Sequence, residues 1–251
     1  SVSQFFVDRF GPVHDRRWLV VDRQGQFLTQ RQHARMALVR TALEAGHVTL
    51  SAPGCEPVQF SAADFTDGCS GAAARQVQVW RDRCEAVAGP AHLDAWLSAF
   101  LGVDCLLVFM PESSRRPVNP DYATAGETVS FADGFPLLLA SEESLQDLNG
   151  RMNIAIGMER FRPNLVVQGG AAFAEDGWQR IRVGSMEFRV VKPCSRCAIP
   201  TIDPLTAQKQ PEVFKTLKSY RQRDGEVFFG QNLLPVGTGS VRVGDRVELL
   251  A

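Results

Sequence analysis

The chain lacks an excess of charge of either sign. Its 251 residues include 27 lysines and arginines and 28 aspartates and glutamates, which gives a net charge of −1. Proteins that bind nucleic acids normally carry a basic excess or stripe, so we expect no nucleic-acid partner. No apolar run is long enough to span a bilayer, so we expect no membrane association. The N-terminus has no charged-then-apolar signal pattern, and we expect a cytoplasmic location.

The chain is also poor in the patterns that build zinc sites and disulfide frameworks. Six cysteines are present, but only Cys194 and Cys197 lie close together, and the four histidines form no H-x3-H pattern. A structural zinc site commonly needs two close pairs of ligands. A chain of this length can bury its core without disulfides, so we expect most thiols to be free in a reducing cytosol.

What the chain does contain is a series of short β-rich runs cut by Gly, Pro and Asp. RWLVVD, HVTLSAP and QVQVW in the first half, and FPLLLA and NLVVQ in the second, predict strands. Alternation on both sides of Gly184 predicts a hairpin, and VRVGDRVELL predicts a second hairpin or a bent strand turning at Gly244 and Asp245. Helices are predicted over 90–102, 141–152 and 211–221.

Residues 111–127 mark the best domain boundary, because they are rich in Pro, Ser, Gly and charge. We therefore predict two domains, 1–112 and 113–251. Strands outnumber helices and come in short runs with tight turns. This pattern predicts a mainly β fold with some α (α+β), built from a β-barrel-like N-terminal domain and a β-barrel C-terminal domain with covering helices.

The segment KPCSRCAIPTIDP (192–204) holds the close cysteine pair. Pro200 and Pro204 predict an extended segment rather than the helix that a thioredoxin-like dithiol requires. Two inert buried thiols are one alternative, since cysteine packs well as a small apolar residue. Lys192 and Arg196 favour one activated sulfur, because positive neighbours lower a thiol pKa and a thiolate is a good ligand for a soft metal centre. These residues alone leave both alternatives open.

The same segment carries a resemblance to a known family. KPCSRC followed by TIDP resembles the hallmark of the MOSC domain, the C-terminal domain of molybdenum cofactor sulfurases. FRPNLVVQGGAAFAEDGW, LKSYR, FGQN and VRVGDRVELL resemble the branch that contains the mitochondrial amidoxime-reducing component and bacterial reductases of N-hydroxylated bases. DRRWLVVDRQGQFLTQRQ resembles that branch's MOSC N-terminal β-barrel domain. The family's opening Lys-Ser segment, which binds a phosphate, precedes this chain, so we expect that domain to lack its first strand.

The resemblance implies a site for the molybdenum cofactor (molybdopterin) in a cleft between the two domains. By motif position, Cys197 would be the metal ligand and a catalytic residue, Arg162 would contact the cofactor, and Arg16 would hold its phosphate. Asp133 and Asp203 are candidates for the catalytic proton donor. The motifs imply four further cofactor-binding positions, namely Asn164, Ser195, Arg196 and Asn232.

Other arginines also lie near the predicted boundary. A phosphate dianion favours the bidentate geometry of arginine. Arg17, Arg115 and Arg116 are therefore additional candidates, with a solvated surface charge as the alternative for Arg115 and Arg116.

The implied reaction is the reduction of N-hydroxylated compounds (hydroxylamines, amidoximes and N-hydroxylated bases) to amines or amidines. The iron–sulphur domain of some relatives is not part of this chain, so we expect no iron–sulphur cluster and a separate electron-donor protein of the ferredoxin or flavin type. The alternative is a sulfur (persulfide) carrier, or a protein that carries the cofactor without turnover.

Overall fold

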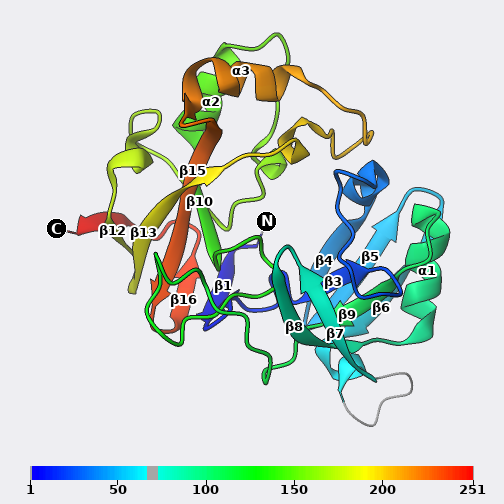
Figure 1. Ribbon diagram of the computed structural model, residues 1–251. Coiled ribbons are helices and arrows are strands. Elements are labelled where there is room, and N and C mark those ends of the chain that lie inside the picture. The colour runs from blue at the N-terminus through cyan, green and yellow to red at the C-terminus, as the bar shows by residue number, and fades with distance from the viewer. Residues whose placement is uncertain (1, 67–72, 251) are drawn as a thin grey trace. The chain divides into compact units, whose positions relative to one another are not determined.

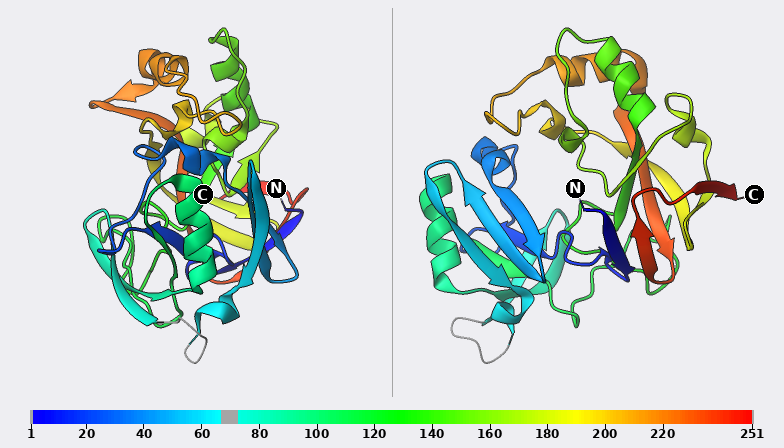
Figure 2. Two further views of the ribbon diagram at one scale, coloured as in Figure 1. Left: turned by 90° about the vertical axis from the view of Figure 1, so that its right-hand side faces the viewer. Right: turned by 180° about the vertical axis from the view of Figure 1, so that it is seen from behind.

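The computed structural model describes residues 2–66 and 73–250, and contacts within the chain divide it into two compact units (Figure 1, Figure 2). Unit 1 is formed by Ser1–Asp15, Pro117–Ile202 and Lys209–Ala251, and unit 2 by Arg16–Arg116 and Asp203–Gln208. The first residues of the chain thus contact the second half. The units follow contacts rather than chain order, and the domain limits 1–112 and 113–251 stay a prediction.

Strands dominate both units, which confirms the predicted mainly β fold with some helix. The helices of the described residues are α1 (Ala91–Leu101), α2 (Glu142–Gly150) and α3 (Glu212–Arg221). None of them is long and apolar enough to cross a membrane. The strands of unit 1 are β1 (Gln4–Asp8), β2 (Gly11–Pro12), β10 (Leu137–Ser141), β11 (Leu165–Val167), β12 (Arg180–Val183), β13 (Met186–Ser195), β14 (Gln222–Arg223), β15 (Glu226–Val236), β16 (Gly239–Arg242) and β17 (Val247–Leu250). Those of unit 2 are β3 (Trp18–Val21), β4 (Arg40–Glu44), β5 (His47–Ala52), β6 (Cys55–Ser61), β7 (Ala73–Val79), β8 (Asp82–Ala88) and β9 (Leu106–Phe109).

Unit 1 is built on a curled sheet in the order β11-β10-β15-β13-β12-β17, with β14 paired to β15. All these pairs are antiparallel except β10 with β11. The predicted hairpin is confirmed as β12 and β13, and Gly184 turns with a φ of +58°. The second predicted hairpin is wrong, because β16 pairs with β1 and β17 pairs with β12. The local alternation of apolar and polar residues identified both strands correctly. It could not show that each strand pairs with a partner far away in the sequence.

The two helices of unit 1 lie together at one end of the long strands β10 and β15 (Figure 1). Helix α2 begins as predicted at Ser141, whose Oγ accepts a hydrogen bond from the Ser144 amide at 3.3 Å. Leu148 of α2 and Leu217 of α3 are buried in one cluster with Phe229 of β15. The helices therefore cover the part of β15 that pairs with the cysteine-bearing end of β13.

Unit 2 contains two sheets, in the orders β3-β9-β8-β7 and β4-β5-β6. Helix α1 ends as predicted at Gly102, which has a φ of +70°. Its buried residues Leu93, Leu97 and Phe100 join a core with strands from both sheets. Trp18 packs edge-on against Phe60 at 5.5 Å within that core.

Candidate functional site

The cysteine pair lies at the C-terminal end of β13. The register of β13 against β15 shifts between Val190 and Lys192 and again between Pro193 and Ser195. Such bulges bend a strand and redirect its side chains. After the strand, Ile199–Thr201 forms a 3-10 turn, so the prediction of a purely extended segment is wrong. Proline is tolerated in a first turn, and the turn is too short to be the helix of a thioredoxin-like dithiol.

Arg196, between the two cysteines, is fixed by three backbone carbonyls. Its amide donates to the Val227 carbonyl at 2.7 Å, its Nε to the Phe229 carbonyl at 2.8 Å, and its Nη1 to the Phe161 carbonyl at 3.2 Å. The guanidinium also lies 5.3 Å from the centre of the Phe161 ring. The remaining nitrogen, Nη2, is buried and has no hydrogen-bond partner among the described residues. One strong donor of this side chain is therefore available to a bound group.

Gly230 allows this arginine to lie close to β15. A Cβ at Gly230 would come within 2.5 Å of the Leu139 carbonyl oxygen and 3.4 Å of Arg196 Nη2. The residue also has a φ of +76°, which L side chains rarely adopt. Both the backbone conformation and the available space require glycine here.

Two predicted residues fall in one row that crosses four strands. Asn164, which precedes β11, exchanges hydrogen bonds with Leu138 of β10. Leu138 is paired with Asn232 of β15. Asn232 is in turn paired with Lys192 of β13. Asn164 Nδ2 also donates to Asp15 Oδ2 at 2.9 Å, so its side chain serves the fold. The side-chain amide of Asn232 makes no hydrogen bond with another group of the described residues.

Cys194 is a free thiol that is partly exposed, as Cys197 is. Burial raises its pKa, and this effect outweighs Arg196, which lowers the pKa. Asp133 and Cys197 raise it further, and Lys192 lowers it. The sequence predicted one activated sulfur in the pair, and at Cys194 desolvation outweighs the positive neighbours. The same interactions place the Asp133 carboxylate close to the cysteine pair.

Cys197 is partly exposed and free, and its Sγ accepts a hydrogen bond from the Ile199 amide at 3.5 Å. Ser195, the last residue of β13, is exposed beside it. Cys55, Cys84 and Cys105 are also free thiols, as expected. Cys69 lies outside the described residues.

The FRPN segment shapes the site from the other side. Arg162 is exposed and has a φ of +55°, a left-handed conformation that is unfavourable for a long side chain. The turn that it makes directs the Phe161 carbonyl toward Arg196. Phe161 and Phe229 stack with ring centres 3.9 Å apart. Backbone strain of this kind is common at ligand sites.

Two predicted residues, Arg16 and Asp203, are assigned to unit 2. Arg16 has a φ of +52°. Asp203 Oδ1 accepts hydrogen bonds from the amides of Leu205 and Thr206 at 2.7 and 3.1 Å, which stabilises a turn. The roles of both residues in cofactor binding and proton transfer stay predictions.

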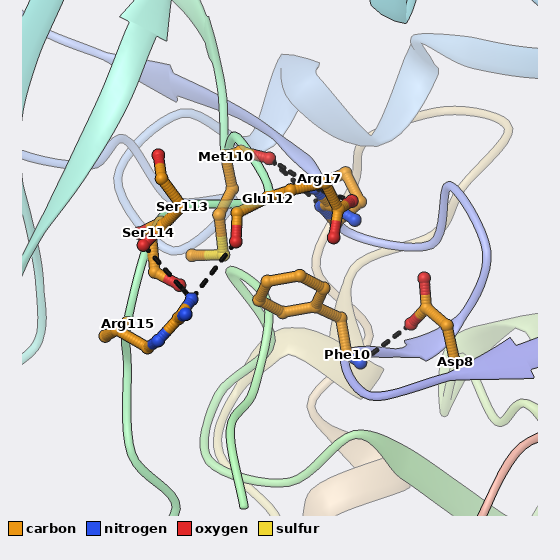
Figure 3. A network of polar contacts seen from close by, with 8 residues as sticks. All are labelled: Asp8, Phe10, Arg17, Met110, Glu112, Ser113, Ser114 and Arg115. Atoms are coloured by element: carbon orange, nitrogen blue, oxygen red, sulfur yellow. Dashed lines mark hydrogen bonds and ion pairs between the residues drawn. The ribbon is translucent and has the colours of Figure 1, made fainter. Parts of the chain in front are cut away.

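The other boundary arginines contact the protein itself, and Figure 3 shows two of them, Arg17 and Arg115. Arg17 donates through Nη2 to the Met110 carbonyl and to Glu112 Oε1, at 2.5 and 2.9 Å. Arg115 Nη1 lies 3.0–3.1 Å from three successive carbonyls, beginning with that of Glu112. Arg116 pairs with Asp82 at 2.9 Å. These contacts support unit 2 rather than a phosphate site.

The site residues predicted from sequence did not include Gly230 or Asp15. A signal existed for Gly230, because a glycine inside the apolar run VFFGQNLL indicates close approach of another group. No local signal marked Asp15, since its position follows from a contact across more than a hundred residues.

Comparison with known proteins adds an independent finding. Residues 126–248 match the model of the MOSC domain, and residues 1–104 match that of the MOSC N-terminal beta barrel domain. The chain is 32% identical to "Mitochondrial amidoxime-reducing component 1" of Homo sapiens, over 96% of this chain and 74% of that protein. It is 34% identical to "Mitochondrial amidoxime reducing component 2" of Rattus norvegicus, over 95% and 74%. It is also 29% identical to "Molybdenum cofactor sulfurase" of Solanum lycopersicum, over 92% of this chain but 30% of that protein. The chain therefore belongs to the family of MOSC-domain proteins that carry a MOSC N-terminal β-barrel domain and include the amidoxime-reducing components.

Proposed function

We propose that the protein binds the molybdenum cofactor and reduces N-hydroxylated compounds (hydroxylamines, amidoximes or N-hydroxylated bases) to amines or amidines. The observation that carries this proposal is the buried, unpartnered Nη2 of Arg196 next to the partly exposed thiol of Cys197. The similarity to amidoxime-reducing components over 96% of the chain supports the reaction class.

The side chains of unit 1 fit such a cofactor. A thiolate at Cys197 is a soft ligand suited to molybdenum. Arg196 Nη2 is a charged donor suited to an anionic group, and Asn232 follows Gly230 by two residues in β15. Among the described residues no group of three or more His, Cys, Asp or Glu side chains is arranged to hold a metal. A metal at Cys197 would therefore take its other ligands from the cofactor.

The residues of this chain would bind, orient and move protons. When bound, the cofactor would supply the two electrons that convert N–OH and two protons into N–H and water. Cys197 would hold the metal through Sγ, and Arg196 would fix the orientation of the cofactor from a position set by its own carbonyl contacts. Asp133 is the better proton-donor candidate, because it is exposed near the cysteine pair, whereas Asp203 Oδ1 already accepts two amide hydrogens.

The electrons must come from a donor, since each turnover consumes two. We propose a separate electron-donor protein of the ferredoxin or flavin type.

The test is to supply the purified chain with molybdenum cofactor, then measure bound molybdenum and the reduction of benzamidoxime by reduced methyl viologen. We expect stoichiometric metal and steady formation of benzamidine. Retention of molybdenum without any benzamidine would contradict the reductase proposal. It would favour a carrier of cofactor or sulfur instead, a role that the similarity to molybdenum cofactor sulfurase supports.

The predicted cofactor contacts are tested separately through retention of the metal. Loss of one charge-assisted contact in Arg162→Ala or Arg16→Ala should weaken cofactor binding by about 10- to 150-fold. Full molybdenum content in both variants after extensive dialysis would show that neither arginine holds the cofactor.

A further inference from the structure

Unit 2 contains a cavity that none of the predicted cofactor residues lines. It has a volume of about 410 Å³ and lies between the segment 22–33 and the turn of the β7–β8 hairpin. Its apolar wall includes Phe27, Leu28 and Trp80, and its polar wall includes Arg31 and Asp22.

The walls of this cavity are fixed by backbone contacts. The Phe27 amide donates to the Gln78 carbonyl at 3.2 Å, and the Gln78 amide donates to the Gly25 carbonyl at 2.8 Å. Gly25 has a φ of +83°, and a Cβ there would lie 2.6 Å from the Gln76 carbonyl oxygen. Asp22 Oδ1 accepts the amide hydrogen of Gln26 at 2.8 Å. The segment is therefore held against β7 before any ligand arrives.

Arg31 supplies the polar feature that points to a ligand. Its guanidinium lies 4.4 Å from the centre of the Trp80 ring, and its Nε is buried without a hydrogen-bond partner among the described residues. Among the described residues, Arg31 also forms no ion pair. Arginine cannot lose its proton at any ordinary pH, so the unpartnered donor calls for an external acceptor.

Trp80 holds one wall in a strained conformation. Its φ is +57°, which is rare for a bulky side chain and unfavourable. Phe27 contacts the same indole edge-on, with ring centres 5.0 Å apart. Strained backbone conformations concentrate at ligand sites, where the surrounding structure over-determines them. Here the strain presents one indole to both Phe27 and Arg31.

We propose that this cavity binds a small carboxylate with a planar apolar body. The carboxylate accepts hydrogen bonds from the Arg31 guanidinium, whose planar fork matches its geometry. The body lies against Phe27 and Leu28. A monoanion is preferred over a phosphate dianion, because the Asp22 carboxylate also lines the cavity and repels added negative charge.

The test uses benzoate as the probe and the full chain as the protein. Calorimetric titration gives the affinity, and the indole N–H signal of Trp80 in NMR spectra locates the site. We expect saturable benzoate binding that shifts this signal, and weaker binding of inorganic phosphate. Absence of benzoate binding, or tighter binding of phosphate, would overturn the proposal.

Three variants separate the guanidinium from general effects. Arg31→Met should weaken benzoate binding at least about tenfold, the loss of one charge-assisted contact. Arg35→Met is the matched control, because Arg35 also lies over an aromatic ring, 4.6 Å from Phe100, but does not line the cavity. Trp80→Asn removes the indole while tolerating the positive φ, and it should also weaken binding. Equal affinities of wild type and Arg31→Met, both shown to be folded by circular dichroism, would contradict the assignment.

Discussion

Arg196 in unit 1 and Arg31 in unit 2 each bury a guanidinium nitrogen that has no hydrogen-bond partner among the described residues. They differ in what holds the rest of the side chain. Arg196 donates to two carbonyls across more than thirty residues, so it ties β15 and the FRPN turn together. Arg31 only rests on Trp80. The first arginine is therefore part of the fold and of the site, whereas the second contributes a donor and little stability.

Glu175 shows a third way to bury an unpartnered polar atom. Its Oε1 accepts a hydrogen bond from Ser144 Oγ at 2.7 Å, and its Oε2 is buried without a partner. Burial raises the pKa of this carboxyl. A carboxyl can relieve its burial by keeping a proton, which an arginine cannot do by losing one. The unpartnered nitrogens of the two arginines therefore indicate ligands, whereas the unpartnered oxygen of Glu175 belongs to a group whose pKa burial raises.

The largest effect is expected at the thiol beside Arg196. Cys197→Ser should lose bound molybdenum and benzamidoxime reduction, because it removes the proposed metal ligand. Cys194→Ser is the matched control and should keep most of both, since the raised pKa of Cys194 makes its sulfur a poor ligand. Metal analysis and steady-state rates give the answer, and a more damaging Cys194→Ser would reverse the assignment.

A large loss of stability is expected where β15 approaches Arg196. Gly230→Ala places a Cβ 2.5 Å from a carbonyl oxygen in addition to the cost of a positive φ. Gly237→Ala is the control, because Gly237 has a φ of +84° and open space around it. The control should lose about 1–2 kcal/mol, and Gly230→Ala clearly more. Urea unfolding measures both, and equal losses would show that the close approach costs nothing.

The two arginines should differ in their effect on folding. Arg196→Gln leaves the Phe161 and Phe229 carbonyls without their donor, which should lower the free energy of unfolding by about 1–3 kcal/mol. Arg31→Met breaks no hydrogen bond within the described residues and should cost about 0.5–1 kcal/mol, the value of an exposed cation–π contact. Thermal and urea unfolding of both variants test the comparison. A larger loss for Arg31→Met would contradict the structural distinction.

Glu175 should make stability fall as pH rises. Its pKa is higher in the folded protein than in the unfolded chain, so between the two values folding takes up a proton. Stability relative to Glu175→Gln should therefore decline from about pH 4 upward, by at most about 1.4 kcal/mol per pH unit, until the folded pKa is reached.

A second carboxyl provides the opposite sign as a control. The pKa of Glu143 is lowered, chiefly by the Gly169 amide, which donates to its Oε1 at 2.6 Å. Its contribution is present above the unfolded pKa and is lost as pH falls, so Glu143→Gln should flatten the acid side of the profile. Urea midpoints from pH 3 to 8 measure both slopes. Parallel curves for wild type and Glu175→Gln would show that the buried carboxyl does not titrate differently on folding.

Local sequence patterns predicted the strand-rich character of the chain, its three helices, the start of α2, the end of α1, and the family. Each of these depends on local patterns. Ser141 and Gly102 limit helices through hydrogen bonds and φ values set by the residues nearby. The motifs around Cys197 and Arg162 are likewise contiguous, and a resemblance needs no knowledge of their contacts.

Which buried donors lack a partner among the described residues depends on the tertiary structure. Neighbouring charges predicted one activated sulfur, and only the folded structure shows that desolvation outweighs Arg196 and raises the pKa of Cys194. Asn164 looks like a cofactor contact in sequence, yet its hydrogen bonds go to Leu138 and Asp15. Arg31 lies within the segment DRRWLVVDRQGQFLTQRQ, but that pattern does not show a donor without a partner; the packing of Trp80 against it leaves its Nε buried and unpartnered among the described residues. Burial and hydrogen-bond partners depend on residues far apart in the chain, and no local pattern records them.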